Sequence, residues 1–584
     1  MSRRMNKFDF AISAISRESL LIPYSLVMSR VAVIKRSSTV LLVVGPATTL
    51  AISPFSNFDP INPAKMIIVS SCAFGLLFLL IGDIKHHLAK LPLGIALASI
   101  VFVSWMSIVL FVTGAPINQQ FWGVFGRNNG YLGYFCLLVI LLAIALIQEK
   151  RFYHKLVDVL VLTAAPMTVY ALVQLAGRDP VSWSFMAPFA TLGNVNFSSA
   201  FFGLASISAT VLALAPKQNP YLRVFLLAMV AVDLFIILET GSIQGFMIYI
   251  AGMGFAGFFF VRAYKPLKIL QIPYLFLGIV GFAFTALALN NIGPLARFIF
   301  GETILFRFDY WYAGWAMTLG NPVFGVGLDS YGDWYREVRG ELATLRTTPD
   351  RITNTAHNIY LDISASGGFP LIAAYLFLLG YAFRAAWRLT RRENAFNPYF
   401  VALFSTWIAY LIQAAISINQ IGVGIWGWLF TGALIGYEIA TRKDATIRPE
   451  RKSKIDGPQL PASVALLGMV GVGVGFILAF VPFNADARFK DALQTGNPVE
   501  QFTQAKALGA TAYHMELALD AAIKANNEPL ASEIVIELLD RYPRDFMGWQ
   551  VRQILSSTTP EDRERAYERL KEMDPFNPNV QRAG

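Results

Sequence analysis

The stretch LPLGIALASIVFVSWMSIVLFV, residues 91–112, contains no charged side chain and is long enough to cross about 30 Å of hydrocarbon as an α-helix. Twelve further apolar runs of comparable length occur along the chain. Because every backbone polar group inside a bilayer needs an internal hydrogen-bond partner, such runs are expected to form helices. The sequence therefore predicts an all-α, polytopic membrane protein of about 12–13 transmembrane helices, at roughly 38–54, 66–82, 91–112, 131–148, 156–176, 197–215, 223–240, 243–261, 269–289, 369–387, 398–418, 421–440 and 459–482.

The overall composition agrees with a membrane protein and argues against a protein that binds nucleic acid. Of the 584 residues, 55% are hydrophobic and 15% are charged, whereas about a quarter of the residues of a soluble domain are charged. The net charge of +10 does not indicate a binding patch, because the basic residues lie mainly in short connectors between the apolar runs.

The distribution of Lys and Arg predicts which connectors face the cytoplasm. A basic lead-in at 1–37 precedes the first run and has no signal-peptide pattern with a small-residue cleavage site. Alternate connectors are basic, whereas the short connectors on the other side carry only Lys65, Arg127 and Arg178. We therefore expect a multi-pass protein of the cytoplasmic (inner) membrane whose N-terminus is cytoplasmic.

Two large pieces are then expected outside the cytoplasm: the connector at about 290–368 and the tail after Phe483. The tail has amphipathic helix patterns with breaks at Tyr542-Pro543-Arg544-Asp545 and at Asp574-Pro575-Phe576-Asn577-Pro578, where helix pairs of tetratricopeptide-type repeats usually end. Such a tail either holds a protein partner or is a helical cap that only packs. The expected divisions are a basic cytoplasmic segment at 1–37, a membrane core at 38–441, a basic cytoplasmic linker at 442–458, an additional transmembrane helix at 459–482 and an extracytoplasmic helical-repeat domain at 483–584.

Neither cysteine chemistry nor a metal site is expected. Cys72 and Cys136 both lie inside apolar runs and have no zinc-binding spacing. The outside segments contain no Asp-x-Asp pair.

Three outside segments concentrate the residues able to perform chemistry. The first, FWGVFGRNNG at 121–130, places Arg127 in a glycine-rich and aromatic loop. The second, RFDYWYAGWAMTLGNPVFGVGLDSYGDWY, begins at Arg307. The third, TNTAHNIYLDISASGGFPLI, contains His357, the only histidine expected in the outside loops.

The second and third segments resemble the O-antigen ligase and polymerase superfamily, which also includes oligosaccharyltransferases that glycosylate secreted bacterial proteins. The family pattern has an arginine, a tryptophan a few residues later, the stretch hPxxGxGxxxY, and then HNxxLxxxxxxG before a membrane helix. Segments around Arg127 (FGRNNGYLGYF) and at 191–204 (TLGNVNFSSAFFGL) are also similar to family segments, so the resemblance covers roughly residues 90–440. The matching positions in the large loop are Arg307, Trp311, Asn321, Pro322, Gly325, Gly327, Tyr331, His357, Asn358, Leu361 and Gly368.

Two positions depart from the family pattern. Many members carry an SRG stretch, whose arginine is thought to hold donor phosphate, at the outer end of a middle helix. This chain has Gln244 there, which cannot supply the charge, so Arg127 or Arg178 would have to supply it. The second glycine of a GxxG motif is Leu371, a change expected to affect helix packing only.

The resemblance implies transfer of a glycan from a polyprenyl-diphosphate carrier to a hydroxyl of a glycan, lipid or protein acceptor at the outer membrane face. Arginine forks match phosphate oxygens and stay charged, and an imidazole, whose ordinary pKa is about 6.5, is a suitable base for a hydroxyl. This chemistry needs neither a metal nor another cofactor. We expect His357 as general base and Arg307 as catalytic residues, and as substrate-binding residues Arg127, Arg178, Asn358, Trp311, Tyr331 and Asp362.

Each of these residues also has a structural interpretation. A lone histidine is more often a surface or helix-capping residue, and Arg307 could extend to lipid headgroups. Asp362 could orient His357 or only face water. Four aromatic residues could stack on sugar rings or pack at the membrane interface: Trp311, Trp315, Tyr331 and Trp334.

Two rival functions remain open at this stage. A transporter or flippase of lipid-linked sugars is favoured by Asp233, because a carboxylate in the middle of an apolar run is often functional. A metal-dependent glycosyltransferase would use an acidic first outside loop, where this chain offers only Asp59. A scaffold that presents the tail would need neither the arginine nor the histidine loops.

Overall fold

The computed structural model describes residues 24–82, 90–183, 188–346, 348–392, 395–442 and 461–581, and within these ranges every regular element is a helix. The all-α fold class is therefore confirmed. Most of the basic lead-in and nearly all of the predicted linker at 442–458 lie outside the described residues.

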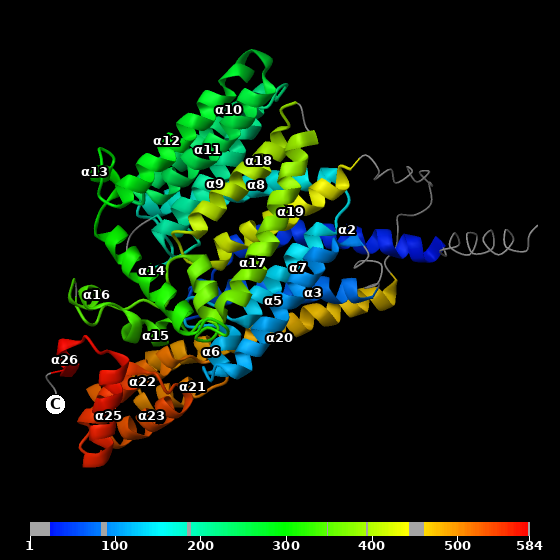
Figure 1. The fold of residues 1–584 in the computed structure, drawn as a ribbon. Coiled ribbons are helices and arrows are strands. Elements are labelled where there is room, and N and C mark those ends of the chain that lie inside the picture. The colour runs from blue at the N-terminus through cyan, green and yellow to red at the C-terminus, as the bar shows by residue number, and fades with distance from the viewer. Residues whose placement is uncertain are drawn as a thin grey trace, which may run out of the picture.

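In this part of the chain, a helix coincides with each of the thirteen apolar runs (Figure 1). Ten of the thirteen are long and apolar enough to cross a membrane, with η1 and α12 counted as one, α7 and α18 are shorter apolar helices, and α2 falls in neither group. The segments are α2 (Tyr24–Leu50), α3 (Asn62–Ile81), α5 (Leu93–Val112), α7 (Tyr131–Ala145), α8 (Lys150–Leu175), α9 (Val195–Ala213), α10 (Pro220–Glu239), α11 (Gln244–Ala263), η1 (Lys265–Leu270) with α12 (Gln271–Leu289), α17 (Ile359–Arg392), α18 (Pro398–Ala414), α19 (Ile421–Ala440) and α20 (Ala462–Thr495).

These helices differ in how deeply they are buried. In α9 and α19, 89% of the residues of the apolar window are buried inside the protein, compared with 6% in the segment of η1 and α12. An apolar helix exposed on nearly all sides is stable against lipid, because acyl chains are as apolar as leucine. The interior is therefore built around α9 and α19, and α12 lies at its edge (Figure 1).

Lys65 corrects one detail of the predicted connectors. It lies in the first turn of α3 and not in an outside connector, and its ammonium is fully buried. It donates hydrogen bonds to the carbonyls of Thr48, Thr49 and Ala51 at 2.8–3.1 Å. The side chain thus satisfies carbonyl groups left open at the C-terminal end of α2.

Helix α17 begins ten residues before the predicted run and is kinked at Gly367 and Gly368. Gly368 has φ +70°, and a Cβ there would lie 2.3 Å from the Val323 carbonyl oxygen. The backbone N–H of Val326 donates to the Ala365 carbonyl at 2.8 Å, and that of Phe369 to Pro322 at 2.8 Å. The glycine-rich stretch of the large loop therefore packs backbone to backbone against the kink, where a side chain has no room.

The described residues of the predicted outside connector at 290–368 are largely helical. It contains α13 (Ala296–Ile299), α14 (Glu302–Gly320), α15 (Tyr331–Val338) and α16 (Glu341–Arg346). The short helix α6 (Ile117–Trp122), α15 and the tail helices lie toward the same end of the membrane helices (Figure 1).

The C-terminal tail forms a helical array with its own apolar core. Helix α20 passes through Pro482 to Thr495 as one element, so the predicted boundary at 482 and 483 falls inside a helix. Both predicted breaks occur between helices, and the assignment to tetratricopeptide repeats stays a prediction. The tail helices are α21 (Pro498–Ala505), α22 (Ala512–Lys524), α23 (Glu528–Arg541), α24 (Phe546–Ile554), α25 (Pro560–Met573) and α26 (Pro578–Gln581).

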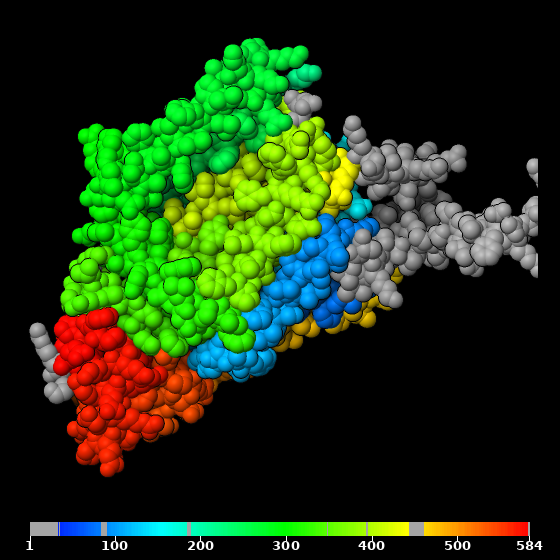
Figure 2. Space-filling model, viewed as in Figure 1, coloured from blue at the N-terminus to red at the C-terminus, as the bar shows by residue number. Residues whose placement is uncertain are grey.

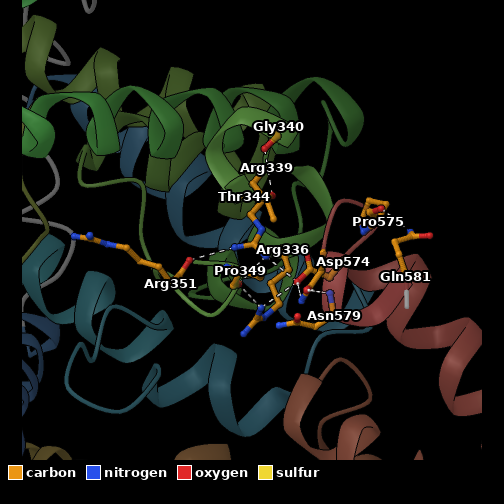
Figure 3. Close-up of polar contacts among 11 residues, drawn as sticks. Arg336, Arg339, Gly340, Thr344, Pro349, Arg351, Asp574, Pro575, Asn579 and Gln581 are labelled. Atoms are coloured by element: carbon orange, nitrogen blue, oxygen red, sulfur yellow. Dashed lines mark hydrogen bonds and ion pairs between the residues drawn. The ribbon is translucent and has the colours of Figure 1, made fainter. Parts of the chain in front are cut away.

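The tail is docked against the large loop, and the two form one continuous surface (Figure 2). The buried carboxylate of Asp574 accepts hydrogen bonds from Arg339 at 2.8 and 2.7 Å and from Arg336 at 3.0 Å (Figure 3). The Arg544 guanidinium lies 3.7 Å from the Trp334 ring centroid and pairs with Glu337. Charged and aromatic contacts thus connect α15 to the tail.

Candidate active site

His357 lies in a tight loop just before α17, which we call the His357 loop (residues 353–358). Its backbone has φ +52°, in the left-handed region that non-glycine residues seldom adopt. The Asp362 carboxylate accepts the Ala356 N–H at 2.6 Å, and the Thr355 hydroxyl accepts the His357 N–H at 3.3 Å. The surrounding hydrogen bonds hold this strained conformation, which is common at functional sites.

The hydrogen bonds of the imidazole assign its tautomer. Nδ1 lies 3.4 Å from the Thr355 carbonyl oxygen and 3.2 Å from the Thr355 hydroxyl. A carbonyl can only accept, so Nδ1 carries the hydrogen in the neutral ring. Nε2 has no hydrogen-bond partner among the described residues and keeps a free lone pair. The ring packs against Tyr310, with centroids 5.2 Å apart.

Arg127 lies on a turn between α6 and α7, which we call the Arg127 turn (residues 123–130). Its Nε donates to the Asn354 side chain at 3.1 Å, so the guanidinium contacts the His357 loop directly. The Asp329 carboxylate accepts the Val124 N–H at 2.8 Å. The first and third outside segments are therefore joined, with Asp329 of the second bracing the turn.

Arg307 lies on α14 and is half-buried. Within the described chain, its guanidinium donates no hydrogen bond and forms no ion pair. Desolvation lowers its pKa, although the nearby Tyr310 favours the charged form. An arginine held partly out of water without an anionic partner is a ready site for an anion.

The electrostatics bring His357, Arg127 and Arg307 together. Burial is the main reason that the pKa of His357 is lowered to about 4, and the charges of Arg127 and Arg307 lower it further against the opposing hydrogen bond to Thr355. The ordinary value near 6.5 assumed from the sequence is thus too high for the free protein. The imidazole is neutral at neutral pH, with its lone pair on Nε2.

Nearby carboxylates partly offset the positive charge of Arg127. Burial lowers the pKa of Arg127, whereas the charges of Asp329, Asp362 and Asp59 raise it. Burial raises the pKa of Asp329 to about 6 against the stabilising N–H of Val124 and the charge of Arg127. No carboxylate forms an ion pair with the Arg127 guanidinium among the described residues, so its charge is only partly offset.

Four predicted substrate-binding residues have structural partners. Asn358 caps α17, since its side-chain oxygen accepts the N–H groups of Tyr360 and Leu361 at 3.0 and 3.2 Å. Asp362 holds the His357 loop through Ala356 and does not face water alone. Tyr331 is 2% exposed and donates to the Tyr310 carbonyl at 2.6 Å, so it supports α14 rather than lining an open site. Trp311 is half-buried against Phe308, with its buried N–H unpartnered.

The four aromatic residues considered for sugar stacking do not form one surface. Trp334 is covered by Arg544 of the tail, while Trp315 packs on Phe369 beside the kink. Arg178 is exposed, and its charge does not act on the pKa of His357. Gln244 is buried, with neither end of its amide hydrogen-bonded. The structure thus brings Arg127 and Arg307 to His357, but not Arg178.

Sequence reasoning missed three residues that build the site: Asn354, Tyr310 and Asp329. Asn354 and Tyr310 lie three residues from His357 and Arg307, within segments already singled out. Asp329 has φ +50°, a conformation that aspartate tolerates better than most residues, but this was not visible in the sequence. Their long-range contacts have no local sequence signal.

Asp59 and Asp233, the residues that favoured the rival functions, accept hydrogen bonds from neighbouring groups of the protein. Asp59 uses one carboxylate oxygen for the N–H groups of Ile61 and Asn62 and the other for the Asn62 side chain. The buried Asp233 accepts hydrogen bonds from Thr168 at 2.5 Å and Ser206 at 3.5 Å. Across the described ranges, no three His, Cys, Asp or Glu side chains are grouped so that they could hold a metal ion.

One family model matches the segment that carries two of the three residues of this site. Residues 224–376, which include Arg307 and His357 but neither Arg127 nor the tail, match the O-antigen ligase family. A search of curated proteins finds no match to the chain. The family match supports glycan transfer of the ligase or polymerase type in general. Residues 224–376 of this chain are therefore similar to the O-antigen ligase family.

Proposed function

We propose that the protein transfers a glycan from a polyprenyl-diphosphate carrier to an acceptor hydroxyl at the outer face of the cytoplasmic membrane, without a catalytic metal. The observation that carries this proposal is the group formed by a neutral imidazole and two arginines, neither of which binds a carboxylate among the described residues. One group accepts a proton, and the other two bind an anionic leaving group.

In the proposed reaction, His357 Nε2 takes the proton from the acceptor hydroxyl while the hydroxyl oxygen attacks the anomeric carbon of the donor sugar. The bond between that carbon and the diphosphate oxygen breaks, and polyprenyl diphosphate leaves with the bonding electron pair. Arg307 and Arg127 stabilise the charge that develops on the diphosphate, because arginine forks pair with phosphate oxygens. Atoms and charge balance without another reactant.

The low pKa of the free imidazole fits this sequence of events. Before the donor binds, two positive charges oppose protonation of His357. A bound diphosphate offsets those charges, and a nearby negative charge favours the imidazolium. Donor binding therefore raises the basicity of His357 when a base is needed.

Other parts of the assignment follow from the charge pattern and the family. The large loop and tail are proposed to face away from the cytoplasm, and the N-terminus to face it. The acceptor is a growing glycan, a lipid or a protein, and membrane lipids surround the helices. The tail is a candidate surface for a protein partner.

The experiment that tests the function is reconstitution of purified protein in liposomes with a radiolabelled polyprenyl-diphosphate glycan and each acceptor class, with EDTA present. We expect a covalent glycan–acceptor product and free polyprenyl diphosphate. Movement of an unaltered lipid-linked glycan across the bilayer would instead establish a flippase. Loss of transfer on EDTA addition, restored by a divalent cation, would contradict the metal-free reaction.

Arg307 provides a sharper test within this assay. Arg307→Ala should abolish transfer, and Arg307→Lys should restore little, because an ammonium cannot form the two parallel bonds of a guanidinium fork. The matched control is Arg297→Ala, since Arg297 is exposed and lies over Phe298 outside the site. Normal turnover of Arg307→Ala would remove Arg307 from the phosphate-binding role.

A further inference from the structure

The C-terminal tail contacts the candidate active site from two directions. On one side it reaches the Arg127 turn, and on the other it holds α15, which supports the partners of His357. Both sets of contacts involve residues far apart in the sequence and buried side chains. Through these contacts the tail can affect where the residues of the candidate site lie.

The first set begins at His514 on α22, which is 1% exposed. The Thr511 N–H donates to its Nδ1 at 3.0 Å, so Nε2 carries the hydrogen and donates to Asp486 at 3.1 Å. The other oxygen of Asp486 accepts the N–H groups of Phe58 and Asp59 at 2.8 and 3.1 Å. The tail thereby fixes the first outside loop.

Hydrogen bonds of Asp59 connect the first outside loop to the Arg127 turn. Its carboxylate accepts the Asn62 side chain at 3.2 Å, and the same amide nitrogen donates to the Gly126 carbonyl at 3.0 Å. Gly126 directly precedes Arg127, and the Arg127 guanidinium also donates to the Gly126 carbonyl at 3.2 Å. A continuous chain of hydrogen bonds therefore connects His514 to Arg127.

An aromatic cluster runs alongside this chain. Phe125, two residues before Arg127, lies 4.8 Å from Tyr513 and 5.4 Å from His514, measured between ring centroids. Phe58 and Phe489 complete the cluster, at 5.5 Å from Phe125 and 4.7 Å from His514 respectively. Such ring contacts hold the Phe125 side of the turn against the tail.

The second set acts through α15. Asp574 binds Arg336 and Arg339 on this helix (Figure 3), and Arg544 accompanies them at Trp334. The same helix carries Tyr331, which donates to the backbone carbonyl of Tyr310, and the Tyr310 ring packs against the His357 ring. The tail thus braces the residues around His357 as well as those around Arg127.

We propose that the C-terminal tail is a positioning element of the transferase site, which acts through His514 and the aromatic cluster to hold Arg127 at its working distance from His357. His514 and Tyr513 are positioning residues and touch no substrate. The proposal rests on the proposed function for its activity readout. A misplacement of about 1 Å by a change remote from the reacting atoms can cost about 100-fold in rate.

The test compares His514→Ala, His514→Gln and Tyr513→Leu in the wild-type and Arg127→Ala backgrounds of the full-length protein. We expect His514→Ala to lower kcat by about 10- to 100-fold. His514→Gln should recover part of this loss, because its amide can still donate to Asp486. Tyr513→Leu, which keeps the Asp486 pair, should cost about two- to tenfold. In the Arg127→Ala background all three should add little further loss, because they act through Arg127.

Amide hydrogen exchange over residues 123–130 gives a readout that does not need turnover. Exchange there should increase in His514→Ala and, less strongly, in Tyr513→Leu. The matched control is Asp562→Ala, which breaks an ion pair with Arg552 inside the tail. It should change neither kcat nor the amide exchange over residues 123–130. If wild-type protein transferred no glycan, the proposed function would fail while exchange still tested the positioning.

Three results would overturn the proposal. The first is unchanged exchange over 123–130 in both His514→Ala and Tyr513→Leu. The second is losses in kcat that multiply fully with that of Arg127→Ala. The third is an equal effect of Asp562→Ala, which would show general destabilisation of the tail.

Discussion

Replacing Asp574 with Ala removes the carboxylate that fastens the tail to α15. The Asp574 side chain is fully buried, and that of Arg339 is 1% exposed. After the change, the acceptors that Arg339 keeps within the described chain are the carbonyls of Pro349 and Arg351. Its charge then stays buried without a carboxylate bound to it among these residues as long as the tail remains docked.

Removing one partner of a buried ion pair costs about 3–5 kcal/mol. Because about 1.4 kcal/mol changes an equilibrium tenfold, the fraction of molecules with the tail displaced from α15 should rise by about 10²- to 10⁴-fold. The control pair of Arg552 and Asp562 is partly exposed, and such pairs contribute below about 1 kcal/mol. Asp562→Ala should therefore raise the displaced fraction less than about sixfold.

Limited proteolysis of the detergent-solubilised protein measures the displaced fraction. When opening and closing are fast relative to cleavage, the cleavage rate follows the equilibrium population of the open form. We expect release of the tail to be faster in Asp574→Ala by at least about 100-fold and nearly unchanged in Asp562→Ala. Similar cleavage rates in the two variants would refute the view that this buried pair holds the tail in place.

Three further predictions concern pH, orientation and the kink. A general base works only when neutral, so activity should fall as pH drops through the pKa of His357. In kcat/KM, which reports the free enzyme, the fall should occur near pH 4. In kcat, which reports the enzyme with donor bound, it should occur at higher pH. The reverse order would contradict the effect of the bound diphosphate on the pKa of His357. In intact spheroplasts, a cysteine that replaces Leu342, which is 76% exposed, should react with an impermeant thiol reagent. A cysteine that replaces Tyr221, which is 85% exposed, should not react. The opposite labelling pattern would reverse the orientation. Gly368→Ala should destabilise the protein by more than about 1 kcal/mol in thermal unfolding. Gly380→Ala in the same helix should be tolerated, because a Cβ there meets nothing within 4 Å. Equal effects of the two changes would refute the close packing at the kink.

The membrane helices were predictable because lipid leaves little choice of backbone structure. An apolar run such as 91–112 must satisfy its own hydrogen bonds, so its existence as a helix follows from length and composition. The ends were less predictable. Helix α17 begins at Ile359 because Asn358 caps it, and α20 continues past Pro482 in a polar sequence that hydropathy alone does not assign to a membrane helix.

The candidate site was predictable only in part. His357 is conspicuous as the only histidine expected in the outside loops, and Arg307 stands out through the family pattern. The contact of Arg127 with Asn354 spans 227 positions, and no local pattern reveals it. Asn358, which the sequence assigned to substrate binding, uses its side-chain oxygen to cap a helix, a role that the sequence pattern did not indicate. The docking of Asp574 on Arg339, 235 positions away, was equally invisible.

The role of His357 as the base is tested by the transfer rate of detergent-purified His357→Ala, measured with donor affinity in the same preparation. Removing a general base typically costs about 10²- to 10⁴-fold in rate. We expect a loss of that size in polyprenyl diphosphate release and product formation, with donor binding nearly unchanged because the arginines supply it. Release of polyprenyl diphosphate by His357→Ala at the wild-type rate would contradict the assignment of His357 as the base.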